Sequence, residues 1–416
     1  MKNKRTLMIG LIIGLIVAVS AAVACKFAVN LDSPGIPKLY FEGDISEMYE
    51  KSDVREIFVE YVDGERSFQG FAQLKVQGSS SLAYDKKNYT IKFYHDRNGE
   101  EKMPVDVGWG EQNTYCLKAN WIDRTHARNL VTAKLASQVQ QKYGLLTQAP
   151  RNGLVDGFPV EIYSNGDFLG LYTFNIPKSE WQFAMDSDNP NHTVVCGEGW
   201  EPANLFRGEP DFTPWGIEVG QESEETLENL RAMFDFVMNS TDEEFMEHFE
   251  EHLSLDAVLN YYVITDIAFL ADNMGSNMLI ASYDGVKWYL SLYDMDTSWG
   301  ADWKGQELWD YESGLLEMND NLLFERIEKC FPEELAQRYF ELRQDILSNE
   351  HIMEEFHAFR DQIPENSFKK EAWKWGDGLI RTTEDLPGYD YDQIENYLNT
   401  VSDMLDAKYT AMLENG

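Results

Sequence analysis

The chain has 416 residues, of which 35 are Lys or Arg and 72 are Asp or Glu, so its formal net charge is −37. A surface of this sign repels nucleic acids and anionic lipid headgroups, because phosphate groups bind to clustered lysine and arginine. The hydrophobic fraction of 43% and the eleven Trp allow a substantial core and exclude a globally disordered chain.

The first 29 residues form a targeting segment. Three basic residues precede an uninterrupted apolar run over residues 7–24, as in a signal peptide or an N-terminal anchor. Its fate is open between cleavage after residues 22–24, lipid attachment at Cys25 as in a lipoprotein, and retention as an uncleaved membrane helix. Each places the rest of the chain outside the cytoplasm, with this segment as its only contact with the membrane. Residues 30–37 are expected to form a linker.

The other cysteines are Cys116, Cys196 and Cys330. Their wide spacing lacks the CxxC pairs of zinc sites, and their odd number does not suggest a disulfide framework. We expect isolated core residues.

Strand patterns dominate the chain from residue 38 to about residue 180. Residues 56–62 and 68–77 are separated by Asp63-Gly64, and residues 160–163 and 168–174 by Asn165-Gly166; both dipeptides favour tight hairpins. Residues 88–94 also alternate, so we expect an antiparallel sheet. Between the hairpins, apolar spacing predicts one helix that begins at an Asp123 cap and ends at Gly144.

Helical patterns dominate residues 181–416. Residues 181–220 are rich in Gly, Pro and Asn, which predicts a long irregular excursion. Helices are expected over residues 223–239, 242–253 and 255–270, the second of them opened by a capping sequence at residues 240–243. Two short strands flank Asp284-Gly285, and helices return from residue 317. This order predicts an α+β protein with a β-rich N-terminal lobe and a mainly helical C-terminal lobe.

The segment from residue 266 to residue 300 carries the candidate chemistry. Asp272 follows a predicted helix, Asn277 lies five residues later, and the expected hairpin ends at Asp294-Met295-Asp296. Protein kinases have the same order: a D-x-x-x-x-N loop, a hairpin and a metal-binding Asp. We therefore assign Asp272 as the catalytic base and Asn277 and Asp294 as ligands of Mg²⁺ or Mn²⁺, with Asp296 as a further candidate ligand.

A purely structural interpretation of these residues is also open, because Asp and Asn are common in turns and at strand ends. No His-Arg pair precedes Asp272, so the pattern differs from that of ordinary eukaryotic-type kinases.

Four blocks in chain order carry a family resemblance. They are L-K-V-Q-G-S-S-S with K-K-N-Y-T-I-K-F at residues 74–93, L-K-A-N-W-I-D-R-T with R-N at 117–129, G-D-F-L-G-L-Y at 166–172, and Y-D-M-D-T-S-W-G at 293–300. Together they resemble the CotH kinase family, an atypical kinase branch that includes spore-coat protein H. The resemblance implies a kinase-like fold, ATP with Mg²⁺, and phosphorylation of Ser/Thr-rich secreted, cell-surface or spore-coat proteins.

Carried over by position, the resemblance implies that the loop with Ser79 and Ser80 approaches the phosphates of ATP. Lys75, Lys87 and Lys92 are the candidate lysines that neutralise them. Two departures are visible: residues 75–79 differ from the family's R-G-N, and no Glu follows the strand near residues 175–176. Because of these two departures, a non-catalytic pseudokinase is the alternative interpretation.

Single motifs allow three further interpretations. His248, Glu251 and His252 fit the H-x-x-E-H pattern of zinc peptidases, although amphipathic packing explains the same residues. The D-x-D at residue 294 also fits a Mn²⁺-dependent nucleotide-sugar transferase, but no βαβ pattern precedes it. A surface adhesin would use an aromatic sugar-binding face, for which the candidates are Trp299, Trp303, Trp309 and Tyr311.

Overall fold

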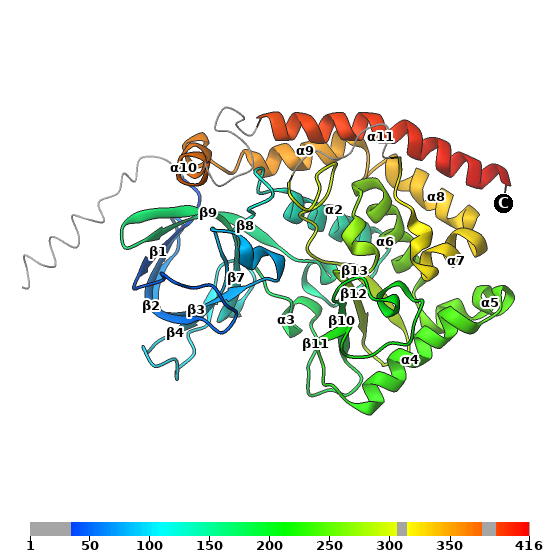
Figure 1. The fold of residues 1–416 in the computed structure, drawn as a ribbon, viewed down its shortest axis with the longest axis horizontal. Coiled ribbons are helices and arrows are strands. Elements are labelled where there is room, and N and C mark those ends of the chain that lie inside the picture. Colours follow the sequence, from blue (N-terminus) through cyan, green and yellow to red (C-terminus); the bar gives the residue numbers. More distant parts are fainter. Residues whose placement is uncertain (1–34, 306–313, 377–387, 416) are drawn as a thin grey trace, which may run out of the picture.

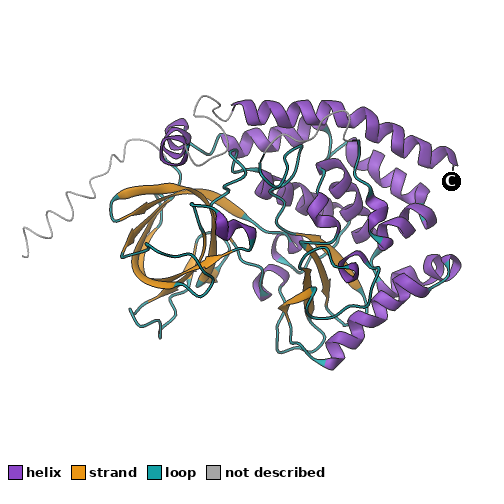
Figure 2. Cartoon of the chain, in the orientation of Figure 1, coloured by secondary structure: helices purple, strands orange, loops and turns teal. Residues whose placement is uncertain are grey.

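The computed structural model describes residues 35–305, 314–376 and 388–415. Figures 1 and 2 show a strand barrel beside a larger body of helices that surrounds a small second sheet. The mixed α+β class predicted from the sequence is confirmed. The targeting segment over residues 1–29 lies outside the described residues. Among the described helices, none has both the length and the apolar character needed to cross a membrane.

Seven strands close into the barrel in the order β1-β2-β3-β4-β7-β9-β8. Both predicted hairpins are confirmed, as β2 with β3 and β8 with β9. The predicted antiparallel sheet is confirmed for β1 to β4. The barrel closes through one parallel pair, β1 with β8, which the sequence did not predict. The strand bounds are β1 (Lys38–Glu42), β2 (Val54–Val62), β3 (Ser67–Gln77), β4 (Asn88–Tyr94), β7 (Thr114–Lys118), β8 (Gly157–Ser164) and β9 (Asp167–Asn175).

The barrel core follows from the alternation of its strands, which sends every second side chain inward. Ile57, Val59 and Tyr61 of β2 are buried with Leu74 and Val76 of β3 in one cluster. Charged side chains at the intervening positions face outward. A two-stranded pair, β5 (Val105–Asp106) with β6 (Glu111–Gln112), lies between β4 and β7 in the chain.

Helix α2 (Arg128–Lys142) lies in the chain between the barrel strands β7 and β8 but packs in the helical body, where it contacts α6 (Leu255–Ala268) and α9 (Asn349–Arg360). The expected cap is wrong in detail, because the N-cap position is Ala127. Asp123 instead folds back on the helix: its Oδ2 accepts the backbone N–H of Arg128 at 2.8 Å, and its Oδ1 pairs with the Arg128 guanidinium at 2.7 Å.

The second sheet has the order β11-β10-β12-β13 and is antiparallel throughout. Its strands are β10 (Thr193–Gly197), β11 (Trp215–Val219), β12 (Met278–Ser282) and β13 (Trp288–Leu292). The β12–β13 hairpin at Asp284-Gly285 is confirmed. The prediction of an irregular excursion over residues 181–220 holds only in part, because two short strands, β10 and β11, interrupt it and the short α3 (Glu180–Phe183) lies at its start. These elements are short, and the turn-forming residues between them obscured their strand and helix patterns in the sequence.

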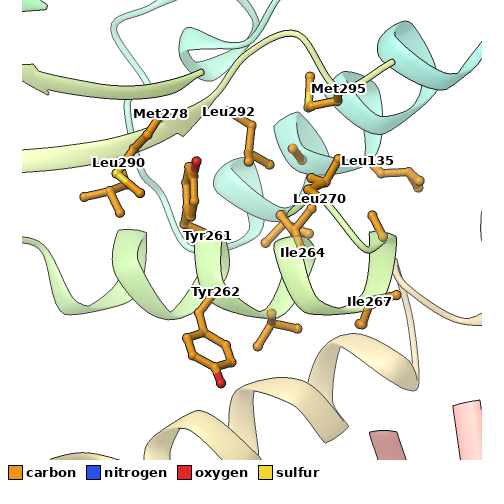
Figure 3. Close-up of a cluster of buried hydrophobic side chains, with 14 of the residues drawn as sticks. Leu135, Tyr261, Tyr262, Ile264, Ile267, Leu270, Met278, Leu290, Leu292 and Met295 are labelled. Carbon is orange, nitrogen blue, oxygen red and sulfur yellow. The ribbon is translucent and has the colours of Figure 1, made fainter. Parts of the chain in front are cut away.

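Helix α6 is the centre of the helical body and is buried on every side, from Ala257 to Ala268. In Figure 3, Tyr261 faces Leu290 of the second sheet, whereas Tyr262 points to the opposite side of the helix. A capping box opens α5 as predicted, but one residue later than the predicted residues 240–243, with Thr241 and Glu244 as reciprocal partners. The other helices are α4 (Glu224–Asn239), α5 (Asp242–His252), α7 (Leu322–Cys330), α8 (Pro332–Arg343), α10 (Glu365–Trp375) and α11 (Gly388–Asn415).

Candidate active site

A cleft of about 670 Å³ is lined by residues from both the barrel and the helical body, a size that suits a small-molecule ligand. The barrel contributes the loop of residues 78–81, which leads into the short 3-10 helix η1 (Ser80–Ala83), and residues 118–122 after β7. The body contributes residues 197–199 after β10, together with Asp272, Asn277 and the residues that follow β13.

The loop of residues 272–277 follows α6 through the short 3-10 helix η4 (Ala271–Met274). The buried Asn273 fixes this loop. Its side-chain Nδ2 donates to the backbone carbonyl of Tyr293 at 2.8 Å, and its backbone carbonyl accepts a hydrogen bond from the Tyr261 hydroxyl at 2.6 Å. Asn277 has a left-handed φ of 58°, which Asn tolerates, and its N–H donates to the Gly197 carbonyl at 2.9 Å. Asp272 and Asp294 therefore belong to loops that are tied together.

The loop of residues 294–299 is held by the start of helix α2. Asn129 accepts the N–H of Met295 at 3.1 Å, and the Arg128 Nε donates to the Ser298 carbonyl at 3.1 Å. The N–H of Trp299 donates to the Ala268 carbonyl at 2.7 Å. The R-N pair of the second sequence block thus fixes the loop that carries Asp294 and Asp296.

Three carboxylates in this cleft influence one another; with Asn277 they form the acidic side, comprising Asp272, Asn277, Asp294 and Asp296. Burial, followed by the charge of Asp294, raises the pKa of Asp272, although a Thr297 hydroxyl 3.5 Å away acts in the opposite direction. Burial, Asp294 and the neighbouring Asp123 and Asp272 raise the pKa of Asp296 far above its usual range despite the attraction of Lys118. A bound cation would relieve this repulsion.

The donor set fits Mg²⁺ better than a metal that needs a complete protein cage. No three or more His, Cys, Asp or Glu side chains within residues 35–305, 314–376 and 388–415 form a complete metal-binding group. Mg²⁺ is commonly held by only one or two carboxylates, with water and substrate phosphate as its other ligands.

Two lysines that the sequence analysis did not name also line the cleft, and one of them, Lys118, lies beside a carboxylate of the acidic side. The Lys118 Nζ lies 3.8 Å from the Asp294 Oδ1, and the Lys178 ammonium lies 4.4 Å from the centre of the Tyr293 ring and pairs with Glu218. Burial opposes the charge of Lys118, but Asp294 and Tyr293 outweigh it and raise the pKa of Lys118 above its usual value. We call Lys118, Lys178 and residues 78–81 the basic side of the cleft.

The comparisons with known proteins place the chain in a family. Residues 74–405, most of the chain, match the family model described as CotH kinase protein. The chain belongs to the CotH kinase family. The match covers both sides of the cleft, helix α2 and most of α11. No curated protein matches the sequence.

Membership in the CotH family indicates a kinase-like protein, and six of the residues singled out from the sequence line its cleft: Ser79, Ser80, Asp272, Asn277, Asp294 and Asp296. The three lysines predicted to neutralise the phosphates do not line this cleft. Lys75 and Lys92 are exposed on the outer face of the barrel, because alternation along β3 and β4 turns them away from the core. The Lys87 Nζ donates to the Leu82 and Tyr84 carbonyls.

A sequence signal for Lys118 existed, because it lies within the second CotH-like block. The signal was missed because Lys118 is the last residue of β7, and only the three-dimensional arrangement directs that strand end toward Asp294. Lys178 follows β9 and lies in none of the four blocks, so it had no comparable signal.

The interpretations drawn from single motifs gain no support from the geometry. His248 is half-buried and contacts Glu251, while the His252 ring stacks on Phe236 with centroids 4.1 Å apart. Trp299 is buried, Trp303 is 62% exposed at the cleft, and Trp309 and Tyr311 lie outside the described residues. The three described cysteines are free; Cys116 and Cys196 are buried, as expected of core residues.

Proposed function

We propose that this protein is an extracytoplasmic protein kinase that transfers the γ-phosphate of ATP, with Mg²⁺ or Mn²⁺, to Ser or Thr hydroxyls. The observation that carries the proposal is one cleft whose lining includes both the carboxylates of the acidic side and the lysines of the basic side, with the Lys118 Nζ 3.8 Å from the Asp294 Oδ1. Such a cleft accommodates a metal and a triphosphate together. Membership in the CotH family agrees with this chemistry.

The proposed roles follow from the position of each group in the cleft. The Asp294 carboxylate and the Asn277 amide oxygen would hold the metal, with Asp296 behind them. When bound, the metal supplies positive charge to the triphosphate oxygens. Asp272 accepts the proton of the attacking hydroxyl, and Thr297 orients its carboxylate.

The basic side would hold the phosphates. Lys118 and Lys178 bring two ammonium groups to the cleft of a chain whose net charge is −37, and such positive groups attract a polyanion. Ser79 and Ser80 lie on the loop after β3, where backbone N–H groups are able to approach phosphate oxygens.

We propose a Ser/Thr-rich secreted, cell-surface or spore-coat protein as the acceptor and no nucleic-acid partner. The N-terminal segment would deliver the protein across the membrane and then be removed, carry a lipid, or remain as an anchor. A kinase-like two-lobed arrangement, with the barrel and the helical body as its lobes, is part of the same proposal.

A non-catalytic binding protein on this fold is the second candidate. It is favoured by the exposure of Trp303, which lines the cleft, and of Trp200, which directly follows the cleft residue Gly199. Exposed indole rings beside a cleft are suited to binding another molecule without turnover.

Transfer of radiolabelled γ-phosphate tests the proposal. The full chain is incubated with labelled ATP and a Ser/Thr-rich acceptor protein, in Mg²⁺, in Mn²⁺ and in EDTA, beside Asp272→Ala. The exposed Asp188→Ala is the matched control. We expect metal-dependent labelling that Asp272→Ala abolishes and Asp188→Ala retains. Binding of ATP without labelling of the acceptor or of the chain itself would favour the second candidate.

A further inference from the structure

Lys86 is a fully buried lysine that also lines the same cleft. Its ammonium donates to the Ala119 carbonyl at 2.8 Å, to the Leu171 carbonyl, and to the Glu371 Oε1 at 2.7 Å. An ammonium has three N–H donors, so these acceptors use all of them. Lys86 therefore differs from Lys118, because it has no donor left for a ligand.

Glu371 reaches Lys86 from helix α10, 285 residues further along the chain. Its other oxygen accepts the backbone N–H of Leu171 on β9 at 2.6 Å. Burial lowers the pKa of Lys86 and raises that of Glu371, while the attraction between the two opposes both shifts. Removing one partner alone leaves an uncompensated polar or charged group in the interior.

The hydrogen bond from Lys86 to Ala119 connects the Lys86–Glu371 pair to the cleft, because Ala119 lines it. The Ala119 carbonyl accepts from Lys86, and the Ala119 N–H donates to the Asn88 Oδ1 at 2.6 Å. Asn88 also donates to the Ser81 hydroxyl at 3.2 Å. Ala119 directly follows Lys118, so both peptide groups of Ala119 are fixed beside the lysine that faces Asp294.

We infer that Glu371 and Lys86 are positioning residues of the proposed kinase: helix α10 holds Lys86, Lys86 holds Ala119, and Ala119 sets the direction of Lys118 into the cleft. The inference rests on the proposed function. It makes nucleotide affinity depend on a C-terminal helix that does not itself line the cleft.

Helix α10 has a second polar attachment to the barrel that serves as a matched control. Glu161 of β8 is buried and accepts from the Ser367 hydroxyl at 2.7 Å and from the Lys370 ammonium. This attachment also docks α10 but does not contact Ala119. Substituting Lys370 therefore perturbs docking and leaves the Lys86–Ala119 bond in place.

The test compares Mg-ATP affinity, measured by calorimetry, in the full chain, in the double variant Lys86→Met/Glu371→Gln and in Lys370→Gln. The double variant removes both buried charges and keeps an acceptor for the Leu171 N–H, so it avoids the cost of an unpaired charge. We expect it to weaken binding about tenfold, as the loss of one positioning bond would, while Lys370→Gln stays within about twofold of wild type.

Asn88→Ala releases the other side of Ala119 and should reproduce the weakening, even if the double variant does not fold. Amide hydrogen exchange should also accelerate at residues 118–121 in each weakened variant but not in Lys370→Gln. Wild-type affinity in both the double variant and Asn88→Ala would overturn the inference alone, as would an equal loss in Lys370→Gln. Absence of Mg-ATP binding in the wild-type chain would overturn the proposed function, and this inference with it.

Discussion

The two sides of the cleft are built in different ways. The acidic side comes from two loops near each other in the sequence, at residues 272–277 and 294–297, joined by the β12–β13 hairpin. The basic side is assembled from separate places: the loop after β3, the end of β7 and the segment after β9. A local motif therefore reports the acidic side, whereas only the closed barrel brings the basic side together. Substitutions on the two sides should accordingly affect different steps, chemistry on one and nucleotide affinity on the other.

The largest effect is expected at Asp272, because its proposed work is confined to the transfer step. Asp272→Asn should lower kcat by about 10² to 10⁴, the usual range for losing a general base, with ATP affinity nearly unchanged. Thr297→Val, which removes only the hydroxyl 3.5 Å from Asp272, should lower kcat a few-fold at most. Single-turnover kinetics separate the two; a kcat that does not change in Asp272→Asn would exclude Asp272 as the base.

Asp294→Asn comes next, with an effect whose sign depends on the metal. With Mg²⁺, we expect ATP binding to weaken by about 10- to 100-fold, because the variant loses a charged metal ligand. In EDTA the variant should bind ATP at least as tightly as wild type, because a carboxylate beside Lys118 no longer repels the phosphates. Calorimetry measures the ATP affinity of the variant and of the wild type in both buffers. Equal weakening in both buffers would contradict the assignment of Asp294 as a metal ligand.

Gly197→Ala tests how tightly the second sheet holds the acidic side. A Cβ at Gly197 would lie 2.0 Å from the Gly275 carbonyl oxygen, so the loop of residues 272–277 has to move. We expect a loss of about 1–3 kcal/mol in the free energy of unfolding, typical of overpacking, together with reduced transfer. Gly208→Ala is the control, since its nearest neighbours would lie 3.3 Å away. Chemical denaturation of both variants decides whether the contact is as tight as described.

The smallest effect on activity is expected on the basic side, where two lysines are proposed to bind the phosphates. Lys118→Met should raise the KM for ATP about tenfold and change kcat little, since one of two ammonium groups remains. Lys92→Met should stay within about twofold, because Lys92 lies on the outer face of the barrel. Steady-state kinetics at fixed Mg²⁺ compare the variants. A larger effect at Lys92 than at Lys118 would restore the lysine assignment made from the sequence alone.

The sequence was most informative where one element carries the signal. The sequence predicted the Asp63-Gly64 and Asn165-Gly166 turns and the β12–β13 hairpin, because each depends on residues close in the chain. It also predicted a capping box at the start of α5, one residue before the observed one. The parallel β1–β8 pair was missed because barrel closure joins strands more than 100 residues apart. Strands β10 and β11 were missed because each has only five residues among turn-forming neighbours.

The same distinction explains the candidate site. Asp272, Asn277, Asp294 and Asp296 share a short segment, and all four line the cleft. For a lysine on a strand, the face on which it lies decides whether it reaches the cleft, and register between strands sets that face. Lys118, at the end of β7, reaches the cleft, whereas Lys75 and Lys92 lie on the outer face of the barrel. Lys178 lies after β9 rather than on it, so its place depends on the path of the chain beyond that strand.

A crystal structure of the chain with Mn²⁺ and a non-hydrolysable ATP analogue tests the central claim most directly. We expect an anomalous Mn²⁺ peak beside Asp294 and Asn277, with the phosphates between that metal and Lys118. A nucleotide bound elsewhere, or a metal that does not contact Asp294 or Asn277, would contradict the account.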